Sequence, residues 1–307
     1  MNESDFRRGI LVEVQRRSAS VVDDETGAEI HCAYSPEINL KSFSNFAVGD
    51  RVAFFPGDGS QEALITNVFP RTSKISRPGP SERFAREQIL AANVDLLVAV
   101  TSSSRPDFNP RQLDRYLALA ENFGVEALIC VNKSDLQPGL PEAVLYLETL
   151  GYSAVTCSAL TGFGIETLRD KLRGRIAVLA GPSGAGKSSL IHALIPEAGA
   201  VAGDVRRDGK GRHTTTTSRL YVTADGVRLI DTPGLRELGL WNVTPGEVPG
   251  LWRDFRPYLG KCKFTDCLHR SEPECAVLAA VAAGAIPDTR LQSYYRVLDT
   301  LGDIIED

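Results

Sequence analysis

From Gly9 to Phe69 the chain alternates turn-forming residues with short β-prone runs of apolar and polar positions. This pattern is typical of strands that bury one face. The predicted strands span residues 10–14, 19–23, 29–34, 51–55 and 63–68. Short strands in this arrangement predict an OB-fold-like β-barrel over residues 1–71, a fold whose open face and loops often bind oligonucleotides. A barrel with a purely structural role is the alternative, because a fold does not by itself give a function.

A basic segment without periodicity follows the predicted barrel. Residues 71–80 hold three cations and two prolines and show no repeating apolar positions. Such composition favours a connecting segment over a folded element. We expect residues 72–90 to form a basic linker.

From about residue 91 apolar runs alternate with helical periodicity, as in a parallel sheet that helices cover on both faces. Predicted strands span 94–100, 125–131, 153–156, 176–180 and 227–230, and predicted helices span 110–122 and 188–194. The sequence therefore predicts a multidomain α/β protein with its central domain over residues 91–241. Helical stretches at 249–259, 274–283 and 289–301 then predict a small α-helical domain over residues 242–307.

Composition limits the functions that this architecture can have. The 307 residues carry a net charge of -5, so a uniformly basic nucleic-acid coat is excluded and any RNA contact needs local patches. The N-terminus lacks the apolar core of a signal peptide, and the longest apolar run is too short to cross a bilayer. We expect a cytoplasmic protein with no membrane or DNA partner. No heptad pattern is present, and we expect a monomer.

A phosphate-binding motif follows the predicted strand 176–180 and opens the next helix, the context that gives this pattern its meaning. Its residues are Gly181, Pro182, Ser183, Gly184, Ala185, Gly186, Lys187 and Ser188. The glycines allow backbone N–H groups to approach phosphate oxygens at a helix N-terminus. Lys187 is expected to bridge the outer two phosphates, and the Ser188 hydroxyl to bind Mg²⁺, which prefers hard oxygen ligands.

The segment Asp231-Thr232-Pro233-Gly234 ends the predicted strand 227–230. Asp231 is expected to hold Mg²⁺ through a water molecule, and the Gly234 N–H to contact the γ-phosphate. Taken alone, this tetrapeptide is also an ordinary turn. Its spacing from the phosphate-binding motif leaves room for one helix, a switch loop and a strand, which favours the phosphate-sensing interpretation.

A guanine-reading motif, Asn132-Lys133-Ser134-Asp135, lies at another strand end. Asp135 can accept both N–H donors on the Watson–Crick edge of guanine, which adenine lacks, so GTP is expected to be preferred over ATP. Lys133 would lie along the base plane, and Asn132 would brace neighbouring loops. This motif precedes the phosphate-binding motif, whereas it follows in ordinary GTP-binding domains. The reversed order predicts a circularly permuted P-loop GTPase domain.

Two further segments fit this domain less specifically. Ser158 and Ala159, after Cys157, match a loop that supports the guanine carbonyl through a backbone N–H, although the tripeptide alone is weak evidence. Residues 203–218 have almost nothing apolar to anchor them and are a candidate switch loop. Thr215 is the favoured Mg²⁺ ligand there, with its threonine neighbours as alternatives. An ordinary surface loop is the other interpretation.

The expected catalytic group is Lys187, Gly234 and His213. Position 235 is Leu, so the glutamine that usually positions the attacking water is missing from its place and hydrolysis is expected to be slow without a partner. His213 is the best substitute, because an imidazole can orient or deprotonate water near neutral pH. A solvent-exposed or RNA-contacting role for His213 is equally open.

A cysteine-rich cluster lies in the predicted helical domain. Cys262, Cys267, His269 and Cys275 offer three thiolates and one imidazole within fourteen residues, a set that fills a tetrahedral Zn²⁺ site. Because protein groups occupy all four positions, the set indicates a structural ion. Unligated cytosolic thiols are the alternative. The remaining cysteines lie apart inside apolar runs and are expected to be buried small hydrophobic residues.

The barrel, the permuted motif order, Gly-Arg-His-Thr-Thr at 211–215, Asp-Thr-Pro-Gly-Leu at 231–235 and the Cys/His cluster together resemble the RsgA family, the ribosome small-subunit-dependent GTPases A. The resemblance covers almost the whole chain. It implies guanine recognition by residues 132–135, phosphate binding by residues 181–189, Ser189 included, and a zinc ion on the cluster.

The resemblance also implies GTP or GDP with Mg²⁺, a role late in assembly of the small ribosomal subunit, stimulation of hydrolysis by that particle, and contact with its rRNA. We expect hydrolysis to drive release from the subunit. The alternative is a nucleotide-dependent RNA-binding module with incidental turnover, because Leu235 predicts poor intrinsic chemistry.

Overall fold

The computed structural model describes residues 6–38, 46–57, 62–79, 87–196, 218–232, 239–240 and 242–305. The chain forms two compact units. The first unit contains residues 1–97, 166–179 and 188–237, and the second contains residues 98–165, 180–187 and 238–307.

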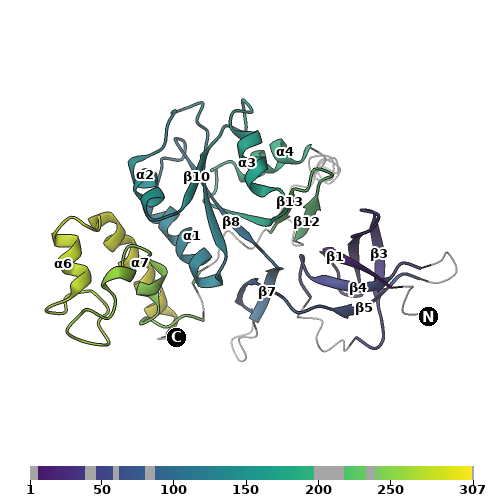
Figure 1. Ribbon diagram of the computed structural model, residues 1–307, viewed down its shortest axis with the longest axis horizontal. Helices are drawn as coiled ribbons and strands as arrows, with labels where there is room; N and C mark the ends of the chain where they lie inside the picture. The colour runs from purple at the N-terminus through teal and green to yellow at the C-terminus, as the bar shows by residue number, and fades with distance from the viewer. Residues whose placement is uncertain are drawn as a thin grey trace. The chain divides into compact units, whose positions relative to one another are not determined.

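The first unit begins with a closed five-stranded barrel, drawn in purple and blue in Figure 1. Its strands are β1 (Arg7–Val14), β2 (Ser18–Asp23), β3 (Glu29–Tyr34), β4 (Arg51–Phe55) and β5 (Leu64–Val68). Strand β1 pairs with both β2 and β4, and β3 pairs with β5 in parallel, so the ladder closes on itself. Leu11, Phe54 and Ile65 are fully buried inside. The predicted barrel is confirmed, with each strand within three residues of its expected start.

The segment expected to be an unstructured basic linker contains a strand pair. Strand β6 (Lys74–Pro78) pairs antiparallel with β7 (Glu87–Ala92). Ile75 is fully buried, and Lys74 and Ser76 both bond to Glu87. Arg71 donates hydrogen bonds of 2.6 and 2.7 Å to the buried carboxylate of Asp50. Alternation of apolar and polar residues is too weak here to predict this ladder, because β6 ends at a proline and its partner strand lies beyond residues 80–86.

The first unit continues with a three-stranded segment beside the barrel. Strand β11 (Ile176–Ala180) pairs in parallel with β13 (Arg228–Asp231), β13 pairs antiparallel with β12 (Arg219–Val222), and β12 lies next to β1. The helices of this part are α3 (Ile165–Leu172) and α4 (Lys187–Leu194). Strand β11 places the phosphate-binding motif at its carboxyl end, as expected.

The second unit holds strands in the order β10 (Ser153–Thr156), β9 (Glu126–Asn132) and β8 (Leu96–Ser102), with helices α1 (Pro110–Phe123) and α2 (Glu142–Thr149). All seven positions of β8 are buried, which explains the unbroken apolar run from Leu96 to Val100. Helix α1 begins where the Asn109 side chain accepts from the N–H groups of Arg111 and Gln112. It ends at Gly124, whose φ of 65° suits a glycine.

The C-terminal part of the second unit is helical, and its described residues from 242 onward contain no strand. Its elements are the 3-10 turns η4 (Val248–Leu251) and η5 (Arg256–Tyr258) and the helices α6 (Ala276–Ala282) and α7 (Asp288–Ile305). The single helix predicted for residues 249–259 is wrong. Pro257 lies in the interior of this segment and lacks the N–H group that a continuous helix needs there, so only short turns form.

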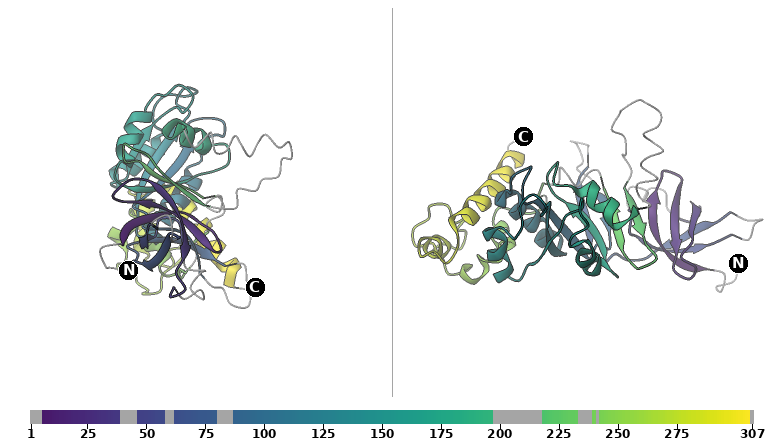
Figure 2. Two further views of the ribbon diagram at one scale, coloured as in Figure 1. Left: turned by 90° about the vertical axis from the view of Figure 1, so that its right-hand side faces the viewer. Right: turned by 90° about the horizontal axis from the view of Figure 1, so that it is seen from above.

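Helix α7 packs along α1 (Figures 1 and 2). Arg290 of α7 is buried and forms ion pairs with Asp254, at 2.9 Å, and with Asp114 of α1. Trp252, Phe255 and Tyr294 form the adjoining aromatic core, with ring centroids 5.2 to 6.3 Å apart. In the part of the chain that the structure describes, we find no helix with the length and apolar character needed to cross a membrane.

Candidate nucleotide site and metal centre

The guanine-reading motif begins at the last residue of β9 and contacts the loop after β10. Ser134 N–H donates to the carbonyl of Cys157 at 3.1 Å, and Ala159 N–H donates to Asn132 Oδ1 at 3.1 Å. Ser158 Oγ donates to Asp135 Oδ1 at 2.5 Å. Asp135 itself is exposed, so its carboxylate faces solvent where a base can reach it. The structure therefore brings the two candidate base-binding loops together.

The same motif braces the phosphate loop. Asn132 Nδ2 donates to the carbonyl of Ala185 at 2.9 Å, and Lys133 Nζ donates to the carbonyl of Gly184 at 2.6 Å. Lys133 also bonds to the carbonyl of Arg105. Its φ of 63° is unusual for a residue with a side chain, and such strained backbone is concentrated at functional sites.

The phosphate loop has positions that only glycine can occupy. A Cβ on Gly181 would lie 2.2 Å from the carbonyl oxygen of Val100. A Cβ on Gly186 would lie 2.3 Å from Asn132 Nδ2, and the φ of Gly186 is 94°. The loop then enters α4 at Lys187, whose ammonium donates to the carbonyls of Gly181 and Pro182 at 2.6 and 2.7 Å. A cationic group thus lies over a tight turn at a helix N-terminus, an arrangement suited to phosphate.

The remaining phosphate-side residues lie in the first unit. Ser188 and Ser189 are exposed in the first turn of α4, and Asp231 is exposed at the end of β13. The next residue, Thr232, has a buried hydroxyl without a hydrogen-bond partner among the described residues. A serine hydroxyl and an aspartate carboxylate are the oxygen ligands that Mg²⁺ prefers, so these residues fit that ion. His213, Thr215 and Gly234 lie outside the described residues.

The cysteine-rich cluster has the dimensions of a zinc site. The ligand atoms of Cys262, Cys267, His269 and Cys275 all lie within 4.8 Å of one another. His269 Nδ1 lies 3.3 to 3.6 Å from the three sulfur atoms, and the sulfurs of Cys262 and Cys275 are 3.8 Å apart. A tetrahedral Zn²⁺ with bonds of about 2.3 Å to sulfur has ligand separations of about 3.8 Å. The four residues therefore fit zinc.

The surroundings of the cluster favour the neutral form of its imidazole. Burial lowers the pKa of His269, with Glu272 acting in the opposite direction, and a neutral imidazole is the form that binds metal. Backbone N–H groups of Ala276 and Leu278 lie 3.4 and 3.5 Å from the sulfurs of Cys262 and Cys275. The hydroxyl of Tyr295 donates to the His269 carbonyl at 2.8 Å and holds its loop.

Sequence reasoning missed one contributor to the nucleotide site. Ser103, just after β8, donates its N–H to the carbonyl of Asn132 at 2.9 Å and its hydroxyl to the carbonyl of Lys133 at 2.6 Å. The carboxyl end of a parallel strand is where such sheets bind ligands, so the position after β8 was the available signal.

Comparisons with known proteins decide the family. Residues 68–241, more than half of the chain, match the sequence model of the RsgA GTPase family. The chain belongs to the RsgA GTPase family. Membership makes it a GTP-hydrolysing enzyme, and it confirms the predicted resemblance and the predicted GTP or GDP with Mg²⁺ as the nucleotide chemistry of the family.

Relatives of RsgA type match most of the chain. The small ribosomal subunit biogenesis GTPase RsgA of Gemmatimonas aurantiaca is 43% identical over 262 residues, which cover 83% of this chain and 84% of that protein. The corresponding RsgA 1 of Vibrio vulnificus is 38% identical over 312 residues, with coverages of 97% and 85%.

Two solved structures share the fold of this chain. The crystal structure of YjeQ from Thermotoga maritima has 32% sequence identity and a TM-score of 0.75, covering 96% of this chain and 98% of that chain. The crystal structure of YloQ, a circularly permuted GTPase, has a TM-score of 0.73 at 24% identity, with coverages of 99% and 98%. The predicted fold class, a barrel, a permuted GTPase domain and a helical C-terminus with a zinc-compatible cluster, is confirmed.

Proposed function

We propose that this enzyme is an assembly factor of the small ribosomal subunit whose GTP hydrolysis is stimulated by the subunit and drives its own release. The names of the Gemmatimonas and Vibrio relatives support the biogenesis role. The observation that carries the enzymatic part is the bond from Asn132 to Ala185, which joins the candidate base-reading and phosphate-binding loops.

In this proposal the guanine base is held by residues 132–135 with Ser158 and Ala159. The exposed carboxylate of Asp135 accepts from the base, and Lys133 lies along its plane. Ser134 positions the motif through its bond to Cys157. The phosphates are held by residues 181–189, with Lys187 on the outer two. The lysine would exchange its present bonds to loop carbonyls for phosphate oxygens.

In this proposal Ser188 and Asp231 would bind Mg²⁺, together with Thr215 from the candidate switch loop. When bound, Mg²⁺ neutralises charge on the β- and γ-phosphate oxygens. The roles of His213 in orienting water, of Thr215, and of the Gly234 N–H toward the γ-phosphate stay predictions. Leu235 beside Gly234 gives the reason to expect slow turnover by the isolated enzyme.

We further propose that Cys262, Cys267, His269 and Cys275 hold one structural zinc ion. With all four positions taken by protein atoms, the ion would stabilise the C-terminal helical part and take no part in the chemistry. The domain division 1–71, 72–90, 91–241 and 242–307 remains part of this proposal.

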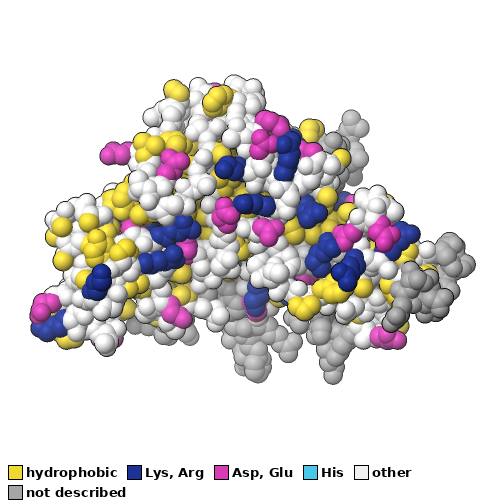
Figure 3. Space-filling model, viewed as in Figure 1, with side chains coloured by type: hydrophobic (Ala, Val, Ile, Leu, Met, Phe, Trp, Pro, Cys, Tyr) yellow, Lys and Arg dark blue, Asp and Glu magenta, His cyan; other side chains and the backbone are white. Residues whose placement is uncertain are grey.

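The expected partner is rRNA of the small subunit, which local basic patches on the protein would contact. On the face shown in Figure 3, the described Lys and Arg side chains lie in small groups beside Asp and Glu side chains. Arg253 and Arg256, for example, both pair with Glu121 at 2.6 Å. This distribution agrees with the net charge of -5. We also expect a cytoplasmic monomer that does not bind DNA.

The test is the rate of GTP hydrolysis with and without purified small ribosomal subunits. The proposal predicts a low basal rate that rises about a hundredfold or more with small subunits, as for other GTPases completed by a partner. Large subunits at the same concentration serve as the control and should have no effect. An equal rate under all conditions would instead favour the RNA-binding module with incidental turnover, which then predicts nucleotide-dependent subunit binding.

A further inference from the structure

Glu13, Arg219 and Asp231 occupy one lateral row across three neighbouring strands of the first unit. Glu13 of β1 is the register partner of Arg219 in β12, and Arg219 is the register partner of Asp231 in β13. Directly opposed residues of antiparallel strands point to the same face of a sheet. The row therefore connects a barrel residue to the residue proposed above as a magnesium ligand.

The backbone ladder between β1 and β12 is short. Within the described residues, β1 and β12 share a single register pair, Glu13 with Arg219. A register shift between Leu11 and Glu13 in the β1–β2 ladder marks a bulge at the same point. Bulges redirect side chains and interrupt strand pairing. Among the described residues, side-chain bonds therefore add to a short backbone ladder between β1 and β12.

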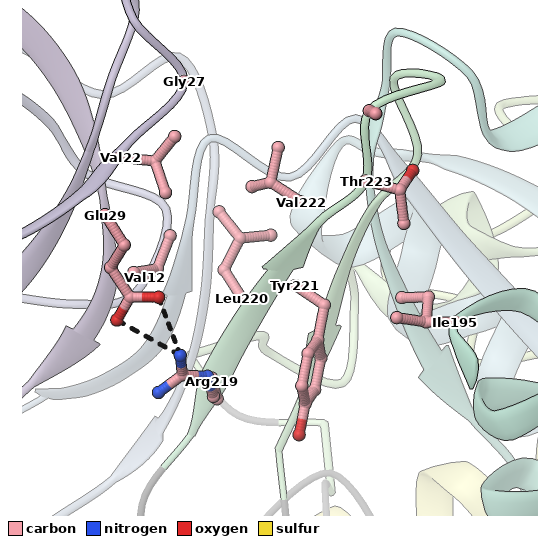
Figure 4. A pocket seen from close by; sticks show the side chains of 11 residues that line it. Val12, Val22, Gly27, Glu29, Ile195, Arg219, Leu220, Tyr221, Val222 and Thr223 are labelled. Atoms are coloured by element: carbon pink, nitrogen blue, oxygen red, sulfur yellow. Dashed lines mark hydrogen bonds and ion pairs between the residues drawn. The ribbon is translucent and has the colours of Figure 1, made fainter. Parts of the chain in front are cut away.

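Arg219 supplies these bonds. Its Nη1 donates to Glu13 Oε2 at 2.7 Å. Its Nη2 donates to both carboxylate oxygens of Glu29 at 2.8 and 3.1 Å (Figure 4). Arg219 and Glu29 line a cavity of about 390 Å³ whose wall also includes Val12 and Val22. The Arg219 side chain is 29% exposed, so solvent screens its charge only in part. A planar guanidinium bonds two carboxylates only in a narrow range of positions, which ties β12 to the barrel.

We infer that Arg219 is a positioning residue, which fixes β12 to the barrel through Glu13 and Glu29 and thereby holds its ladder partner Asp231 in place for Mg²⁺. This inference rests on the proposed function, since only there is Asp231 a magnesium ligand. It gives the barrel a direct route to the nucleotide site, because a shift of Glu13 and Glu29 moves the strand beside Asp231.

The test is the affinity for a fluorescent GDP analogue measured across a range of Mg²⁺ concentrations and in EDTA. In Arg219→Gln, the Mg²⁺ concentration that gives half of the affinity gain should rise about threefold or more, as expected for loss of two partly exposed ion pairs. Affinity in EDTA should not change. Arg219→Lys should restore part of the effect, and Glu29→Gln should shift the titration in the same direction by less. Circular dichroism identifies any variant that fails to fold, in which case Glu29→Gln decides.

The direction of the change in Mg²⁺ response distinguishes a positioning role of Arg219 from a direct effect of its charge on Asp231. Removing a cation near Asp231 would, through Coulomb attraction alone, tighten Mg²⁺ binding. A tighter or unchanged Mg²⁺ response in Arg219→Gln therefore overturns the inference, as does an equal shift in the control Arg228→Gln on β13. If the wild-type protein binds the GDP analogue without any response to Mg²⁺, the magnesium assignment in the proposed function is wrong and the inference falls with it.

Discussion

The side-chain amide of Asn132 donates a 2.9 Å hydrogen bond to the carbonyl oxygen of Ala185, 53 positions later in the chain. Its carbonyl oxygen accepts from the N–H of Ala159 at 3.1 Å. One buried side chain therefore joins three loops, each at the carboxyl end of a different strand. This is the arrangement that a nucleotide needs to be held at its base and at its phosphates together.

Asn132→Ala should weaken GDP binding by about tenfold or more, because it leaves a buried carbonyl and a half-buried N–H unsatisfied, at up to about 1–3 kcal/mol each. The measurement is a titration with a fluorescent GDP analogue. Asn67→Ala, at an exposed position of β5, is the matched control and should bind as the wild type does. Wild-type affinity in Asn132→Ala would show that the three loops do not need this brace.

Gly186→Ala should abolish nucleotide binding, because the new Cβ would lie 2.3 Å from Asn132 Nδ2. The φ of 94° adds a backbone cost for any residue with a side chain. Gly174→Ala separates the two effects, since Gly174 also has a positive φ of 74° but nothing within 4 Å of a Cβ. Nucleotide affinity and melting temperature of both variants are measured together. Equal affinity in the two variants would contradict a steric role at Gly186.

Purified protein should contain one zinc ion per chain, and Cys275→Ser should lose it. The C-terminal helices should then become more sensitive to proteolysis, because zinc sites of this type contribute directly to folding. Cys32→Ser, a buried position of the barrel, should keep its zinc and serves as the control. Elemental analysis decides the question. A metal-free wild-type protein with the same protease resistance would mean that the cluster is a set of free thiols.

Arg290→Met should destabilise the protein by about 3–5 kcal/mol, because it leaves the buried carboxylates of Asp114 and Asp254 without their cationic partner. Arg270→Met is the control. Arg270 pairs with Asp299 at the surface, where an ion pair contributes about 0–1 kcal/mol. Urea unfolding of both variants gives the comparison. A loss below about 1 kcal/mol in Arg290→Met would show that the buried triad contributes no more than a surface pair.

Much of the fold was predictable because the apolar pattern of each segment agrees with the burial of that segment in the structure. The barrel strands and the strand before Gly181 alternate or cluster apolar residues as their burial requires, and their predicted bounds differ little from the observed ones. Strand β12 was not predicted, because it directly follows the polar segment 203–218, which gives no signal for where a strand begins. The prediction for segment 249–259 was wrong because its apolar residues have helical spacing while Pro257 in its interior prevents a continuous helix.

The candidate site was predictable wherever the residue type and its place in a sequence motif indicate the same role, as at Gly186 and Asp135. Ser103 and Arg219 were not, because a serine or an arginine carries no motif of its own. Their roles come from strand pairing, which brings Arg219 opposite both Glu13 and Asp231. Such lateral relations connect residues far apart in sequence and become visible only in three dimensions.

The most direct measurement of the central claim is calorimetric titration of the protein and of Asp135→Asn with GDP, XDP and ADP. If residues 132–135 read the base and residues 181–189 hold the phosphates, the wild-type protein binds GDP and not ADP. Asp135→Asn then loses about tenfold or more in GDP affinity and gains XDP binding, because xanthine presents a carbonyl where guanine presents an amino group. Equal affinity of the wild-type protein for GDP and ADP, or unchanged GDP binding in Asp135→Asn, would contradict the account.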